Sequence, residues 1–122
     1  MTETGPGQPA KTFHHVGLRA TEPQPEEDYI PLTRVFVTDP RKHPNKIEWL
    51  RYEPESHLPE EFKNSPHVAY RVDDLRPHLA GKDIVLLFEV GEPPFAKVAF
   101  TREDGVFYEY MEFKPGRVWF DE

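Results

Sequence analysis

The sequence predicts an α+β fold made of two tandem βαβββ modules, the first with a shortened helix. The main observation is a repeat: "HHVGLRATE" at residues 14–22 returns as "PHVAYRVDD" at residues 66–74. Each copy precedes a segment that can hold a helical turn and then several runs with strand alternation. Since 122 residues suit one hydrophobic core rather than two, the two copies must share it.

The first module is expected at about residues 12–54. In "TFHHVGLRA" apolar residues alternate with polar or small ones, which is typical of a strand. "TEPQPEEDYIP" contains three prolines, so at most one helical turn fits, near residues 26–29. "TRVFVTDP" and "KIEWLRYE" follow as two strands, which we expect to pair as an antiparallel hairpin with their bulky residues packed under helices.

The second module is expected at about residues 66–113, after a polar linker in which Leu58 and Phe62 can anchor a short helical turn. "HVAYRV" predicts a strand and "LRPHLAG" a short helix that ends at Gly81. "DIVLLFEV" is the most apolar run and suits a strand buried on both faces. "FAKVAFTRE" and "VFYEYMEF" flank Asp-Gly, the usual signal for a tight hairpin. Val118, Trp119 and Phe120 are expected to pack over an apolar patch.

Composition narrows the classes of partner and compartment. Residues 1–11 contain little that can be buried and are expected to form a disordered leader, with residues 12–122 as a single domain. The net charge of −7 argues against nucleic acid and against an anionic membrane surface. The chain has no cysteine, no signal-peptide pattern and no apolar run of membrane-spanning length. We therefore expect a cytoplasmic protein whose partner is a small molecule, a cation or another protein.

The repeat places one histidine on the first strand of each module. His15 shares a strand face with Gly17 and Arg19, and His67 shares one with Ala69 and Arg71, because side chains alternate between the faces. The small residue beside each histidine leaves room for a bound group. A single strand histidine is more often a surface or hydrogen-bonded residue than a ligand, but the repetition favours a shared role.

The last strand of each module adds a glutamate. Glu48 in "KIEWLRYE" and Glu109 in "DGVFYEYME" occupy corresponding positions, each between bulky apolar or aromatic neighbours. By alternation both can share the histidine face. Two imidazoles and two carboxylates on one surface form a set of ligands suited to a borderline or hard divalent cation. The sequence thus predicts a metal site at His15, Glu48, His67 and Glu109.

Other polar residues fit this site less well. His14 falls on the opposite face from His15 and has no counterpart, because Pro66 takes its place in the second copy. No role is assigned to the remaining three histidines, and two further glutamates at strand ends are expected to be solvated. These residues are His43, His57, His78, Glu53 and Glu112.

The motifs "HHVGLRA", "KIEWLRYE", "HVAYRVDDL" and "DGVFYEYME" resemble those that carry the metal ligands in the vicinal oxygen chelate superfamily, which includes glyoxalase I, methylmalonyl-CoA epimerase and the extradiol dioxygenases. The resemblance covers roughly residues 13–113. It implies a glyoxalase-like domain with a cupped mixed sheet around one divalent ion. It implies the same four ligands, His15, Glu48, His67 and Glu109, and the ion would be Zn, Ni, Co, Mn, Mg or Fe.

The function implied by the resemblance is a metal-dependent lyase or isomerase that acts on a small oxygenated acid or ketone. An enolate or oxyanion would be stabilised by the divalent cation, and Glu48 or Glu109 would be the catalytic base. Arg19 and Arg71 lie on the site face and are expected to bind a substrate carboxylate. Tyr52 and Met111 are candidates for lining the pocket or for packing. We expect a homodimer, with the four ligands taken from one chain or from two.

Two other functions remain open. A ferrous extradiol-type dioxygenase would use two histidines and one carboxylate, and a fourth protein ligand counts against it. A binding protein that sequesters a small molecule without catalysis would have the same fold, and the shortened first module keeps this reading open. That segment, "EPQPEEDYIP", replaces most of the first helix, so the pocket should be more open than usual in the superfamily.

Overall fold

The computed structural model describes residues 2–3, 9–91, 93–117 and 119. The chain divides into two compact units: unit 1 consists of residues 1–14 and 68–122, and unit 2 of His15–His67. Each unit combines strands with short helical segments, which confirms the α+β class. Of the predicted leader, Thr2–Glu3 forms β1 and pairs with the first residues of β2, Lys11–Arg19, a strand that extends from unit 1 into unit 2.

The strands of unit 2 lie in the order β3-β4-β5-β2. β3 (Asp28–Ile30), β4 (Val35–Val37) and β5 (Ile47–Tyr52) pair in antiparallel fashion, and β5 then runs parallel to β2. The predicted hairpin of β4 with β5 is confirmed. A 3₁₀ turn, η1 (Pro40–Lys42), connects these two strands, and α1 (Glu60–Asn64) is the short helix expected in the linker.

The prediction of a helical turn near residues 26–29 is wrong. Asp28–Ile30 is extended and pairs with Val35–Val37 instead. Glu26 has a positive φ of 58°, which is incompatible with a right-handed helix, and prolines at 23, 25 and 31 remove the backbone donors that a helix needs. The described residues between β2 and β3 therefore form no α-helix.

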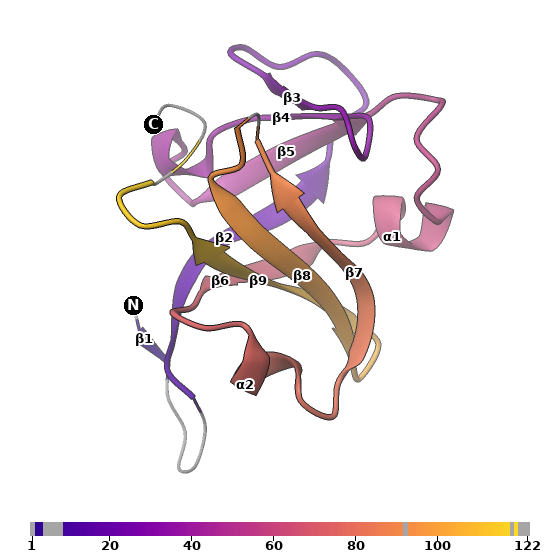
Figure 1. The fold of residues 1–122 in the computed structure, drawn as a ribbon. Coiled ribbons are helices and arrows are strands. Elements are labelled where there is room, and N and C mark those ends of the chain that lie inside the picture. The colour runs from indigo at the N-terminus through magenta and orange to yellow at the C-terminus, as the bar shows by residue number, and fades with distance from the viewer. Residues whose placement is uncertain (1, 4–8, 92, 118, 120–122) are drawn as a thin grey trace. The chain divides into compact units, whose positions relative to one another are not determined.

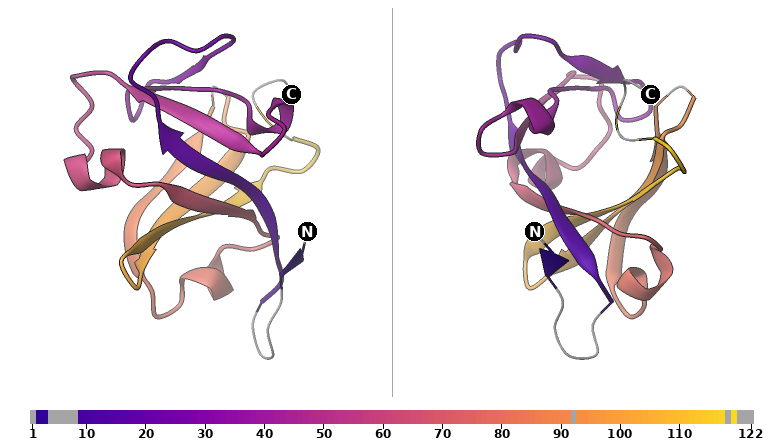
Figure 2. Two further views of the ribbon diagram at one scale, coloured as in Figure 1. Left: turned by 180° about the vertical axis from the view of Figure 1, so that it is seen from behind. Right: turned by 90° about the vertical axis from the view of Figure 1, so that its left-hand side faces the viewer.

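The strands of unit 1 lie in the order β6-β9-β8-β7. β6 is His67–Arg71, of which the first residue belongs to unit 2. The long strands β7 (Asp83–Val90), β8 (Ala96–Glu103) and β9 (Val106–Phe113) run side by side and curve strongly, as Figure 1 and the view from behind in Figure 2 show. Counted from the first strand of each module, the order is β2-β5-β4-β3 in the first and β6-β9-β8-β7 in the second. In both, the first strand lies beside the last, followed by the third and then the second. This identical order confirms that the sequence repeat is a repeat of structure.

The helix α2 (Arg76–Leu79) closes the core of unit 1. Pro77 lies in its first turn, where a missing N–H costs nothing, and Gly81 follows the helix with a φ of 72°, as expected for a helix stop. The β8–β9 hairpin turns through Asp104 and Gly105, both with positive φ, which is the geometry that an Asp-Gly hairpin requires. The turn prediction is confirmed.

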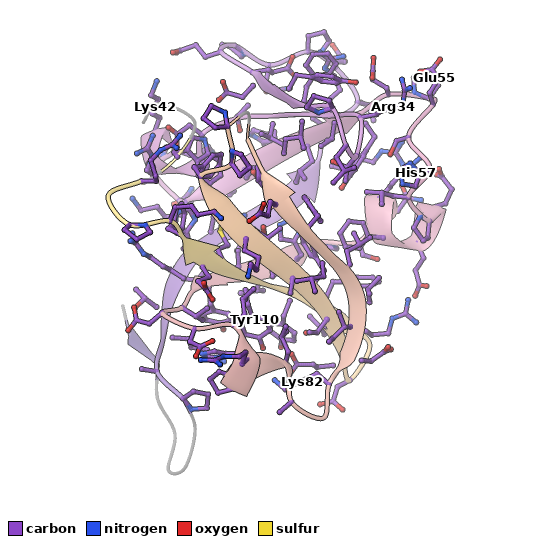
Figure 3. All side chains as sticks on the ribbon, in the orientation of Figure 1. Arg34, Lys42, Glu55, His57, Lys82 and Tyr110 are labelled. Carbon is purple, nitrogen blue, oxygen red and sulfur yellow. The ribbon has the colours of Figure 1, made fainter. Side chains whose placement is uncertain are left out.

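The core of unit 1 is built from the α2 side of the sheet. Tyr70, Val72, Leu75, Ala99 and Tyr110 are buried together. Polar contacts hold the same region: the Tyr110 hydroxyl donates to the Glu103 carboxylate at 2.8 Å, and Lys82 Nζ lies 3.1 Å from that carboxylate. Figure 3 shows Lys82 and Tyr110 beside α2.

The expectation that β7 is buried on both faces is wrong. β7 is the last strand in the order, and Ile84 and Leu87 are 46% and 57% exposed. A continuous apolar run gives no information on how many neighbours the strand has. Trp119 is buried and stacks on His14, whereas Val118 and Phe120 lie outside the described residues. Among the helices of the described ranges, none has both the length and the apolar character needed to cross a membrane.

Candidate functional site

Three of the four predicted ligands meet inside unit 2. His15 lies on β2, Glu48 on β5, and His67 at the start of β6, and all three are buried, with exposures of 0%, 6% and 4%. His15 Nε2 is 3.2 Å from Glu48 Oε1, and His67 Nε2 is 3.8 Å from the same oxygen. The two imidazole rings are 5.5 Å apart and nearly perpendicular. We call His15, Glu48 and His67 the His-Glu-His cluster.

The pairing of β2 with β5 accounts for this geometry. The strands are parallel, with Gly17 opposite Glu48 and Val16 opposite Ile47, and the Val16 N–H donates to the Lys46 carbonyl at 2.9 Å. Because side chains alternate, residues 15, 17 and 19 of β2 lie on the same face as Glu48. The register therefore brings His15 and Glu48 together.

Gly17 makes room for the third member. A Cβ atom at this position would overlap the His67 imidazole, closer than real Cβ contacts ever come. Its φ is not positive, so this glycine is required by space and not by backbone conformation. Gly17, the small residue on the same strand face as His15, therefore leaves the space that the His67 ring occupies.

The donor set fits a divalent cation. Two imidazole nitrogens and a carboxylate oxygen, each able to act as a ligand, lie within 4.8 Å of one another. Burying a carboxylate without compensating charge costs several kcal/mol, as a general estimate, whereas a cation among these atoms would compensate it. Imidazole and carboxylate ligands suit zinc, nickel, cobalt, manganese and iron. The cluster can therefore hold a metal ion.

Glu109 belongs to unit 1. It lies on β9, is 7% exposed, and sits opposite Phe100 of β8 in the antiparallel register. Met111 and Phe107 share its face by alternation and are 2% exposed. The carboxylate thus lies on the face of the sheet opposite Tyr110 and α2, as the alternation predicted.

His14 is separate from the cluster. Its ring stacks on Trp119 at 5.6 Å and lies 5.7 Å from the ring of Phe113, both in unit 1. The preference for His15 over His14 agrees with this arrangement. His78 is buried beside Tyr110, and His57 is exposed.

The two predicted substrate-binding arginines have different surroundings. The Arg19 guanidinium donates to Asn64 Oδ1 at 2.5 Å and lies 3.6 Å from Glu60, both on α1. Arg71 lies in unit 1, with its guanidinium 4.7 Å from the centre of the Phe113 ring. Arg19 is therefore the arginine that unit 2 places on the face of the His-Glu-His cluster.

Sequence reasoning missed two features of unit 2. Ile47 and Trp49 were expected to pack under a helix, but they are only half-buried and line an open cavity of about 290 Å³, because the first helix is absent. A second cavity of about 460 Å³ shares Trp49 and Gln24 with it. Lys63, in the polar segment "PEEFKN", is buried, and no role was assigned to it from the sequence.

Comparison with known proteins supports the fold alone. The chain is similar to the crystal structure of a hypothetical protein, BH1468, from Bacillus halodurans C-125, with a TM-score of 0.60 and 18% identity. The match covers 89% of this chain and 99% of that one. No protein-family model and no curated protein matches the sequence. The strand order of each unit and the two short helices are compatible with a vicinal oxygen chelate fold.

Proposed function

We propose that this protein is a metal-dependent lyase or isomerase of the vicinal oxygen chelate superfamily, acting on a small oxygenated acid or ketone. The observation that carries the proposal is the buried His-Glu-His cluster, in which both imidazoles face one oxygen of Glu48. The sequence repeat supports Glu109 as the fourth ligand, because it occupies the position in the second module that Glu48 has in the first.

A divalent ion at this site would act as a Lewis acid toward substrate oxygens. The residues of the chain then have distinct tasks in the proposal. The two histidines are fixed ligands, held by burial and by the space at Gly17. Glu48 or Glu109 takes a proton from the carbon next to the substrate carbonyl, since a carboxylate near that carbon can act as general base. Arg19 pairs with a substrate carboxylate.

Metal analysis of protein prepared without a histidine tag tests the proposal. We expect one divalent ion per chain in the native protein, its loss in His67→Ala, and weakened binding in Glu48→Gln. His57→Ala is the matched control, because this histidine is exposed and Figure 3 shows it near α1. A native protein that takes up no divalent ion, or a His67→Ala variant that keeps it, would leave only the non-catalytic binding function.

One observation favours a second candidate, a ferrous extradiol-type dioxygenase. Unit 2 alone supplies two histidines and one carboxylate, the ligand set of that class. The two candidates differ at Glu109. The lyase or isomerase reading expects Glu109→Gln to lower metal affinity at least about 10- to 100-fold, the loss seen even when groups that only support the ligands of metal sites are changed. Unchanged iron affinity, with oxygen uptake on addition of a catechol, would favour the dioxygenase.

A further inference from the structure

A second group of polar side chains lies on the same face of unit 2 as the His-Glu-His cluster. In the strand register Arg19 lies opposite Leu50, two residues beyond the position where Gly17 lies opposite Glu48. Tyr52 is two residues further along β5. With a rise of about 3.3 Å per residue, the Arg19 backbone lies roughly 7 Å along the strand from Gly17. A small molecule bound at the cluster can extend over this distance.

Two cations of this group share one carboxylate. Glu60 Oε2 is 3.2 Å from Lys63 Nζ, and Glu60 Oε1 is 3.6 Å from Arg19 Nη1. Lys63 also donates to the Ser56 carbonyl at 2.8 Å. Both cationic groups lie 5.9 Å from the centre of the Tyr52 ring, within the range of cation–π attraction. Glu60 therefore bridges Arg19 and Lys63 beside this aromatic ring.

The three charges differ sharply in exposure. The Lys63 side chain is 5% exposed and the Arg19 side chain 31%, whereas that of Glu60 is 71% exposed. A buried ammonium group needs a compensating anion, so the site favours a negative charge at the position of the Glu60 carboxylate. The pair of Glu60 with the partly exposed Arg19 contributes only about 0–1 kcal/mol, and because Glu60 is 71% exposed, its carboxylate is well solvated when it moves away. Lys63 is thus held in a buried position, whereas the Glu60 carboxylate reaches both cations from the solvent side.

We propose that Arg19 and Lys63 form a carboxylate-binding subsite, in which Glu60 holds the place of the ligand carboxylate and leaves when that carboxylate binds. The ligand class is a small organic acid. That the same acid also reaches the His-Glu-His cluster rests on the proposed function; the subsite itself does not. Arg19 and Lys63 then set specificity for acids over neutral ketones.

Titration of metal-free protein with malonate, followed by ¹H–¹⁵N NMR at constant ionic strength, tests the subsite. We expect saturable shifts in the residues of α1 and at Arg19, which sodium chloride does not reproduce. Glu60→Gln should tighten malonate binding up to about fivefold, the equivalent of losing a competing ion pair of about 1 kcal/mol. Arg19→Gln should abolish saturation, and Lys63→Met should do so if it folds.

The matched control is Glu26→Gln, which removes another exposed glutamate paired with a lysine, Lys42, at 3.3 Å. In Figure 3, Lys42 lies on the opposite side of the view from His57, which is near α1 and therefore marks the region of the subsite. Glu26→Gln should thus leave malonate affinity unaltered. A Glu60→Gln variant with unchanged or weaker malonate binding overturns the subsite, as does saturable binding in Arg19→Gln. The titration uses metal-free protein, so its outcome does not depend on the metal site. If malonate binds but the native protein takes up no divalent ion, the subsite is retained and the proposed function is rejected.

Discussion

The space at Gly17 gives the sharpest test of how the cluster is assembled. Replacing Gly17 by alanine adds a single methyl group, and that methyl would overlap the Cε1 and Nε2 atoms of the His67 ring. The backbone at Gly17 does not have a positive φ, so the substitution introduces no backbone strain of its own. Any loss of stability or of metal affinity must therefore come from displacement of the imidazole or of β2, since alanine otherwise only restricts the unfolded chain.

Two magnitudes follow from this overlap. Forcing an extra methyl group into a well-packed site costs about 1–3 kcal/mol of unfolding free energy. Moving His67 away from Glu48 should also lower metal affinity, by about 10- to 100-fold if the ring shifts but stays near, as for other changes that reorient a ligand. Gly17→Ala is thus expected to lose both stability and metal affinity.

Urea unfolding of the metal-free protein and isothermal titration with Zn²⁺ or Ni²⁺ measure the two effects separately. Val16→Ala is the control, because Val16 is the neighbour on the other face of β2 and its truncation leaves His67 undisturbed. We expect this control to lose stability but to keep its metal affinity. If Gly17→Ala binds the ion as tightly as the native protein, His67 is not positioned by this contact and is not a metal ligand in this geometry.

Three further predictions concern unit 1 and its edge. Burial lowers the pKa of His78, helped by the nearby positive charges of Lys82 and Lys11 and opposed by a hydrogen bond to the Ala10 backbone and by Asp74. The folded state then binds fewer protons than the unfolded state, so the free energy of unfolding should fall as pH drops below about 6.5 toward the folded pKa of His78. Urea titrations of His78→Gln should show a smaller fall over the same pH range. Tyr110→Phe removes the hydroxyl that donates to Glu103 and should cost about 1.5–3 kcal/mol in the same assay, whereas an unchanged midpoint would show that this hydrogen bond contributes nothing. Leu87→Lys should change stability by no more than about 0.5 kcal/mol, because Leu87 is 57% exposed; a loss of several kcal/mol would mean that β7 is covered.

The sequence by itself determined the features that depend on local periodicity and on repetition. Strand alternation placed His15, Gly17 and Arg19 on one face, and the repeat selected His15 over His14. The Asp104-Gly105 turn followed from the need for positive φ at both positions, which few other residues tolerate. Such properties are encoded within a few neighbouring residues, so no knowledge of packing is needed to infer them.

Only the tertiary structure decided what surrounds each strand. An apolar run reads the same in a central strand and at an edge, so the exposure of Leu87 could not be inferred. The role of Gly17 depends on a ring fifty residues further along the chain, and the burial of Lys63 depends on a carbonyl seven residues before it. These outcomes are set by which distant segments meet, and one sequence does not specify those contacts through any local pattern.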